Sequence, residues 1–302
     1  MSFILNIIKN RNFILLLSLL AGFLFSAPAV YIEKYAITIL GVVTAFSVTG
    51  ISFRVFTEYK SLIKFSLQSI LLTYIIHSGL IILLAYFIFD DKLIFLGFVT
   101  IAATPPGVAV ISFTTIFKGN QEFSIKGILG SYLFSLLLTP VILGFFAKEK
   151  NIDVMNILSL IIQTLVIPML LSRFLLIGKM KRITAKIRGK IVNIGFALII
   201  YIAIGLNKDA FFTDFKIIFL SASILFFVIF VIGTVYSKLF QNRINKDLLI
   251  STDLMLTIKS SGFSAATSLA LFGVRASIPS AILSIFILLY LIFAGYKYKK
   301  QK

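Results

Sequence analysis

The chain has 302 residues, of which 59% are hydrophobic and only 13% are charged, and its mean hydropathy is +1.06. A soluble domain carries about a quarter charged residues, so this composition excludes a soluble globular protein and predicts an integral membrane protein. The absence of cysteine and the single histidine exclude disulfide frameworks, thiolate chemistry and multi-histidine metal clusters.

The net charge of +18 does not indicate nucleic-acid binding. The basic residues lie in the links between long apolar runs, which is how membrane proteins set their orientation. No cleavable signal peptide is apparent, and the first apolar run, residues 13–26, is interpreted as the first membrane span.

Apolar runs separated by short charged links predict ten transmembrane helices and no soluble domain. Most runs have the roughly 20 residues needed to cross about 30 Å of hydrocarbon, and each run must be helical to satisfy its own backbone. The predicted spans are residues 12–30, 35–53, 65–89, 93–118, 123–147, 153–176, 190–207, 215–238, 247–272 and 276–296.

The distribution of basic residues predicts that both termini are cytoplasmic. With the amino terminus inside, the inner links hold 21 of the 29 Lys and Arg residues and the outer links hold 7, while Lys259 lies within a span. An excess of positive charge on the cytoplasmic side is the usual pattern. We therefore expect a multi-pass protein of the inner or plasma membrane.

The chain divides near residue 150 into two halves of five predicted spans, 1–150 and 151–302. A repeat with an odd number of spans enters the membrane in opposite directions, which predicts two inverted repeats. The fourth span of each half is interrupted, by Thr104-Pro105-Pro106-Gly107 and by Lys259-Ser260-Ser261-Gly262. Interruptions at corresponding places in two halves indicate a transporter binding site.

The first interruption is predicted to unwind span 4 near the bilayer midplane. Pro105 and Pro106 have no amide hydrogen and their rings clash with the preceding turn, and Gly107 adds backbone freedom. The residues that follow would begin a new half-helix with free N–H groups and partial positive charge at its start. The alternative is a simple proline kink.

Span 9 holds two ionisable groups at membrane depth, Asp253 and Lys259. A charge at membrane depth is costly, so each is a candidate functional residue. If the helix unwinds at the second interruption, Lys259 turns into the crossing as a fixed cation. Asp253 could instead lie at the cytoplasmic interface, near Lys246 and Asp247.

Several other polar residues in the spans have a structural alternative. Serine and threonine hydroxyls often bond to their own helix or to a neighbouring one, which applies to Thr114, Thr115, Ser264, Thr267 and Ser268. The lone His77 in span 3 is more typical of a packed polar residue than of a proton relay, and Gln163, Thr164 and Asn193 are interpreted as interhelical hydrogen-bonding residues.

Around both interruptions the sequence resembles the bile acid:sodium symporter family. The residues that carry the resemblance are Thr104-Pro-Pro-Gly, Phe117-Lys-Gly-Asn, Ser124 and Leu138-Thr-Pro in the first half, and Ser260-Ser-Gly, Ala270-Leu-Phe-Gly and Ile278-Pro-Ser-Ala in the second. The resemblance implies a core domain packed against a panel domain, two crossing helices at the centre, and sodium-coupled uptake of organic anions. The auxin-efflux-like carriers are more distant relatives.

The sequence departs from this family at the sodium ligands. The resemblance places those ligands at Val110, Ile111, Ser124, Met255 and Lys259, and of these only Ser124 keeps an oxygen that the family uses. Hard cations need several oxygen donors. We hypothesise that the Lys259 ammonium stands where a sodium ion would sit and, with the half-helix N-termini, attracts an anionic substrate. Because burial disfavours the charged lysine, Lys259 could also release a proton, so coupling would be proton-based or absent.

The sequence thus predicts an all-α membrane protein that acts as a secondary transporter for a small organic anion, with no cofactor. The alternatives are a sodium-coupled symporter with other ligands, a facilitator, or a non-transporting relative. No paired-carboxylate, histidine-rich or cysteine arrangement predicts an enzyme. The candidate substrate or ion site comprises Thr104, Pro105, Pro106, Gly107, Thr114, Ser124, Asp253, Lys259, Ser260, Ser261 and Gly262.

Overall fold

A computed structural model describes residues 11–50, 58–147 and 154–299, and within these ranges the chain is helical and forms no strand. Seven helical segments of the described chain are long and apolar enough to cross a membrane: Ala27–Val48, Tyr59–Ile88, Gln121–Phe146, Met155–Phe174, Gly178–Leu206, Phe215–Phe240 and Val274–Tyr298. Three shorter apolar helices accompany them, at Phe13–Leu24, Lys92–Ala103 and Ser261–Phe272. The prediction of a helical multi-pass membrane protein is confirmed.

The helices of the first half are α2 (Arg11–Leu24), α3 (Ala27–Ile32), α4 (Ala36–Val48), α5 (Tyr59–Ile70), α6 (Ser78–Ile88), α7 (Lys92–Ala103), α8 (Ala109–Ile116) and α9 (Gln121–Phe146). A π-helical stretch, η3 (Leu71–His77), joins α5 to α6 without a break. Pro28 lies at the start of α3, where proline is tolerated. The predicted first span, 12–30, is therefore not one helix, and the second candidate span begins at Ala27 instead of residue 35.

The second half contains α10 (Val154–Ile161), α11 (Ile167–Phe174), α12 (Gly178–Leu206), α13 (Lys208–Thr213), α14 (Phe215–Phe226), α15 (Ile232–Phe240), α16 (Lys246–Thr257), α17 (Ser261–Phe272) and α18 (Val274–Lys299). The π-helical stretches η5 (Ile162–Val166) and η6 (Phe227–Val231) make α10–α11 and α14–α15 continuous. Helix α12 begins twelve residues before the predicted span at residue 190, because lysine and arginine favour helix and extend it into the basic link.

Some sequence predictions fall outside the described residues. These are the end of predicted span 2, the mid-chain link, and the basic residues Lys9, Arg54, Lys148, Lys150, Lys300 and Lys302. Predicted spans 4 and 9 lie within the described chain, and each is divided into two shorter helices, α7 with α8 and α16 with α17.

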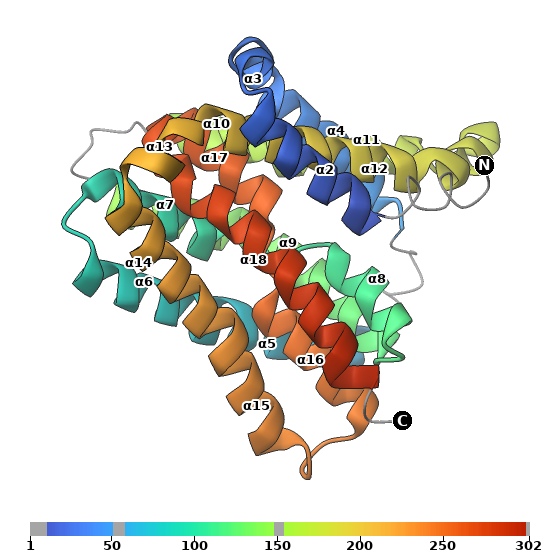
Figure 1. Cartoon of the computed structure of the whole chain (residues 1–302). Helices are drawn as coiled ribbons and strands as arrows, with labels where there is room; N and C mark the ends of the chain where they lie inside the picture. Colours follow the sequence, from blue (N-terminus) through green and yellow to red (C-terminus); the bar gives the residue numbers. More distant parts are fainter. Residues whose placement is uncertain (1–10, 51–57, 148–153, 300–302) are drawn as a thin grey trace, which may run out of the picture.

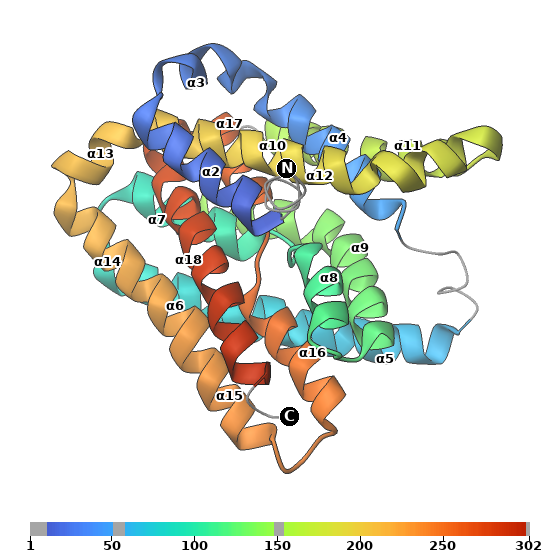
Figure 2. The same ribbon diagram turned by 45° about the vertical axis from the view of Figure 1, so that its right-hand side comes forward.

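The helices pack in two layers, as Figures 1 and 2 show. Helices α2, α4, α10, α11 and α12 contact one another in a small layer, at the top of both views. Helices α5–α9 and α14–α18 form a large layer, and α17, α18 and α9 contact the small one. The two-layer arrangement agrees with the core and panel that the family resemblance implies.

Ion pairs fasten the large layer at helix ends. Arg275, at the start of α18, pairs with Asp91 and Asp214 at 2.8 and 3.0 Å, and Asp91 also caps α7 by accepting from the Leu93 and Ile94 amides. Lys126 of α9 pairs with Glu58 and Glu122. The hydrogen bond and the charge of Lys126 lower the pKa of the Glu58 carboxyl.

Helices α7 and α18 approach closely because Gly97 has no side chain. A Cβ at Gly97 would overlap the carbonyl oxygen of Ala276 and lie 3.0 Å from the Pro279 ring. Gly144 of α9 is a natural comparison, because a Cβ there would meet nothing within 4 Å. Alanine substitutions at the two positions therefore distinguish the effect of tight packing from the intrinsic cost of glycine in a helix.

We expect Gly97→Ala to destabilise the protein by about 1–3 kcal/mol, as overpacking generally does. The midpoint of thermal unfolding in detergent would fall, whereas Gly144→Ala would leave it unchanged or raise it slightly because alanine favours helix. Equal midpoints for the two variants would contradict the close packing of α7 on α18.

Candidate functional site at the paired helix breaks

The two helix breaks meet and pair through their backbones. Helix α7 ends at Ala103, and Thr104 is extended, with ψ of 150°. The Gly107 amide donates to the Ile258 carbonyl at 3.0 Å, and the Ser260 amide donates to the Pro105 carbonyl at 3.3 Å. Pro106 and Lys259 thereby form an isolated antiparallel bridge, and Figure 2 shows the extended stretch between α16 and α17. Backbone groups without helical partners must be satisfied in this way inside a membrane.

The Lys259 side chain caps the end of α7. Its Nζ donates to the carbonyl oxygens of Ala102 and Thr104 at 3.0 and 2.6 Å, and lies 4.5 Å from the centre of the Tyr74 ring. The side chain is only 2% exposed. The C-terminal end of a helix carries partial negative charge, and prolines just beyond it remove amide donors. The ammonium therefore occupies a position that suits a cation.

Other side chains donate hydrogen bonds to the carbonyl groups at the broken helix ends. The Ser78 hydroxyl donates to Ala102 O and the Thr139 hydroxyl to Ala103 O, both at 2.7 Å. At the end of α16, Leu256 O accepts from His77 Nδ1 at 2.6 Å. His77 therefore holds a helix end, while its Nε2 has no hydrogen-bond partner among the described residues.

The remaining predicted site residues that follow each break lie in different surroundings. The hydroxyls of Thr114 and Ser124 are 2.8 Å apart and join α8 to α9 in the protein interior. Ser260 precedes α17 and Ser261 begins it. A Cβ at Gly262 would lie 2.8 Å from the Phe196 ring, so this glycine allows α17 to approach α12.

Asp253 lies apart from the breaks, in a buried cluster between α15, α16 and α18. Its side chain is completely buried, and its Oδ2 accepts from Tyr290 at 2.6 Å, from Lys297 Nζ at 3.0 Å and from Tyr298. Lys297 also donates to Ser237 Oγ at 2.6 Å. Sequence reasoning counted Lys297 only as a cytoplasmic charge, although residues 290, 297 and 298 share one helix face.

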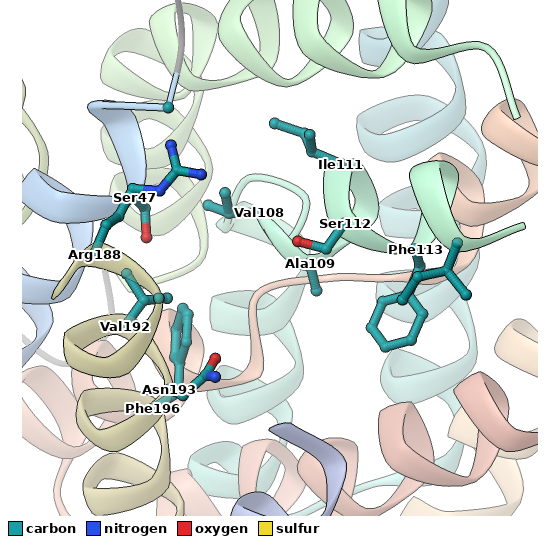
Figure 3. A pocket seen from close by; sticks show the side chains of 13 residues that line it. Ser47, Val108, Ala109, Ile111, Ser112, Phe113, Arg188, Val192, Asn193 and Phe196 are labelled. Atoms are coloured by element: carbon teal, nitrogen blue, oxygen red, sulfur yellow. The ribbon is translucent and has the colours of Figure 1, made fainter. Parts of the chain in front are cut away.

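A cavity of about 390 Å³ lies beside the breaks, between α4, α8 and α12. Figure 3 shows Arg188 and Asn193 of α12 facing Ala109 and Ser112 of α8 across it. Sequence reasoning did not propose Arg188 or Ser112 as site residues and interpreted Asn193 as a hydrogen-bonding residue. No local motif marks them, because they come from two helices, α8 and α12, that lie far apart in the sequence.

A second cavity, of about 40 Å³, adjoins the first and shares Val108, Ala109 and Phe196 with it. Five predicted site residues line this smaller space: Gly107, Lys259, Ser260, Ser261 and Gly262. Thr104, Pro105 and Pro106 form the adjacent break, whereas Thr114, Ser124 and Asp253 line neither cavity. The structure thus brings eight of the predicted residues together.

Helix breaks that pair deep in a membrane protein and border a cavity are typical of transporters. The Sodium Bile acid symporter family model matches residues 38–214, more than half of the chain, and the chain belongs to this family. This match confirms the resemblance inferred from the sequence. The family is one of transporters. No curated protein matches the sequence.

The Asp253 cluster yields a stability prediction. We expect Lys297→Met to destabilise the protein by about 3–5 kcal/mol, because it leaves a buried carboxylate without its cation. The double variant with Asp253→Asn should recover part of the loss of the unfolding midpoint. Lys238→Met, at an exposed lysine of α15, serves as the control. An equal loss in the single and double variants would contradict the ion-pair interpretation.

Proposed function

We propose that this protein is a secondary transporter that moves a small organic anion by alternating access and does not couple transport to sodium. The observation that carries the proposal is the Lys259 ammonium, bonded to the Ala102 and Thr104 carbonyls at the paired breaks. In its protonated form it is a cation supplied by the chain itself, at the place where the family resemblance implies a bound ion.

The ten-span layout is part of this proposal. Among the described residues, the seven long helices, α2, and the two interrupted pairs α7–α8 and α16–α17 give ten crossings if each pair crosses once. Five crossings then belong to each half, as inverted repeats require. The bias of basic residues favours cytoplasmic termini in an inner or plasma membrane.

The cavity supports transport by relative movement of the two layers. One wall comes from α4 and α12 of the small layer and the other from α8 of the large layer. A cavity between two bodies can be exposed first to one side and then to the other when one body rocks against the other. The basic Arg188 lines this cavity, which favours an anionic substrate.

The positions that the resemblance assigns to sodium ligands argue against sodium coupling. Val110 and Met255 are buried and have no side-chain oxygen. Thr114 and Ser124 supply two hydroxyls that already bond each other. This is fewer oxygen donors than a hard cation needs.

Proton coupling is the second candidate mechanism. It is favoured by two buried titratable side chains at the breaks, Lys259 and His77, of which His77 Nε2 has no partner among the described residues. A neutral lysine keeps two N–H donors but loses the attraction of its charge to the end of α7, which would weaken its hold on the two carbonyls. Loss of a proton and rearrangement of the break would then be linked.

The test is uptake of cholate, benzoate and 3-phenylpropanoate by the protein in liposomes, with imposed sodium or proton gradients. We expect wild-type uptake to be independent of the sodium gradient and Lys259→Ala to abolish most of it. Lys238→Ala is the control for loss of an exposed charge. Wild-type uptake driven by sodium would contradict the proposal, and uptake that needs neither gradient would indicate a facilitator.

Thermal unfolding gives a second measurement on the same variants. Lys259→Ala leaves the buried Thr104 carbonyl without its donor, at about 1–3 kcal/mol for an unsatisfied group, while the Ala102 carbonyl keeps the Ser78 hydroxyl, so its midpoint should fall. If the ammonium replaces an ion, the vacated space should accept one. Sodium chloride should then raise the midpoint of Lys259→Ala above its value in choline chloride at equal ionic strength, while the wild type shows no difference.

A further inference from the structure

The larger cavity has two unlike walls, which Figure 3 shows from close by. Arg188, Val192, Asn193 and Phe196 come from α12, and Val108 and Ile111 from the break and α8 opposite. The lining is mostly apolar, and Arg188 is the one charged residue among the described residues that line it. Its volume of about 390 Å³ lies in the range of small-molecule sites.

The Arg188 guanidinium is available to a ligand. Within the described part of the chain, no hydrogen bond or ion pair joins it to another residue. The planar guanidinium carries five donors in a fork that matches a carboxylate. Basic surface residues often have no partner, so availability alone does not make a site, and the position of the side chain must be considered.

Gly50 makes room for the guanidinium at the edge of the cavity. A Cβ at Gly50 would overlap Arg188 Nη1 and lie 3.1 Å from Arg188 Cζ. The turn that follows α4 therefore has no side chain where the cation lies. Arg188 is directed along the cavity wall past Gly50, and Gly50 itself lines the same cavity.

Lys259 does not supply this charge. Its ammonium is engaged by the Ala102 and Thr104 carbonyls and it lines only the smaller space. For an anion in the larger cavity, Arg188 is the one cation on the wall among the described residues. The Asn193 amide and the Ser112 hydroxyl also line the cavity and can donate to the same ligand.

We propose that Arg188 binds the negative group of the substrate, and that the substrate is an organic acid with one negative charge and an apolar body. The body would lie against Val108, Ile111, Val192 and Phe196. A second negative charge would have to be buried on this apolar wall without a cation, which is costly. This inference rests on the proposed function and assigns the charge recognition to a residue outside the helix breaks.

A simpler reading is that Arg188 only helps to orient the chain, as one of several basic residues at the start of α12. Arg182 of the same helix provides the comparison, because both arginines are exposed but only Arg188 lines the cavity. Arg182→Gln and Arg188→Gln remove the same charge from the same helix. Only a binding role predicts that they differ.

The experiment measures binding of 3-phenylpropanoate, its neutral amide and phenylsuccinate to the full chain in detergent, by titration of the thermal midpoint. Uptake of 3-phenylpropanoate in liposomes is measured alongside. We expect the wild type to prefer the monoacid over both analogues. Arg188→Gln should weaken binding of the monoacid by at least about tenfold, as loss of a charged hydrogen bond does, and should remove the preference over the amide.

Three variants keep the result interpretable. Arg188→Lys keeps the charge and should retain part of the affinity, Arg182→Gln should behave as the wild type, and Gly50→Ala should weaken binding by displacing the guanidinium without removing it. Unchanged midpoints without ligand show that each variant is folded.

If Arg188→Gln keeps the preference for the acid over the amide, the inference is wrong while the proposed function stands. If the wild type binds the dianion phenylsuccinate at least as tightly as the monoacid, the proposed substrate class is wrong while the proposed function stands. Failure of uptake of 3-phenylpropanoate, cholate and benzoate together would overturn the proposed function.

Discussion

The structure depends on one constraint, which is that backbone groups released by a helix break inside a membrane must find partners within the protein. Pro105 and Pro106 end α7 and leave its last carbonyls without amide donors. The second break supplies what the first one lacks, through the Gly107–Ile258 and Ser260–Pro105 hydrogen bonds and the Lys259 ammonium. Neither break could be satisfied in this way without the other.

This solution separates two positive charges that would otherwise be candidates for the same task. Lys259 is held by the end of α7 and buried, whereas Arg188 lines the larger cavity and has no partner in the described residues. In our proposals the first replaces an ion and the second recognises the anion. The separation follows from geometry, because a cation that satisfies helix carbonyls has few donors left for a ligand.

The two halves of the second interrupted segment are fixed to different neighbours. Helix α16 is tied to α18 by the buried Asp253 cluster, within the large layer. Helix α17 packs mainly against α18 and α7, and it also contacts α12 of the small layer, where Gly262 lies under the Phe196 ring. Movement of the small layer would therefore be transmitted through α17 to the break and to Lys259.

The sequence by itself determined the membrane class, the family and the positions of both breaks, because composition, proline chemistry and motif order are local properties of the chain. Ten spans and inverted repeats stay predictions, since α2, α7 and α17 are shorter than a full crossing. Only the tertiary structure decided that Lys259 meets Ala102 and Thr104, that Asp253 pairs with Lys297, and that Arg188 lines a cavity. A sequence shows which backbone groups lack partners, but the side chains that satisfy them come from segments far along the chain and are brought close only by packing.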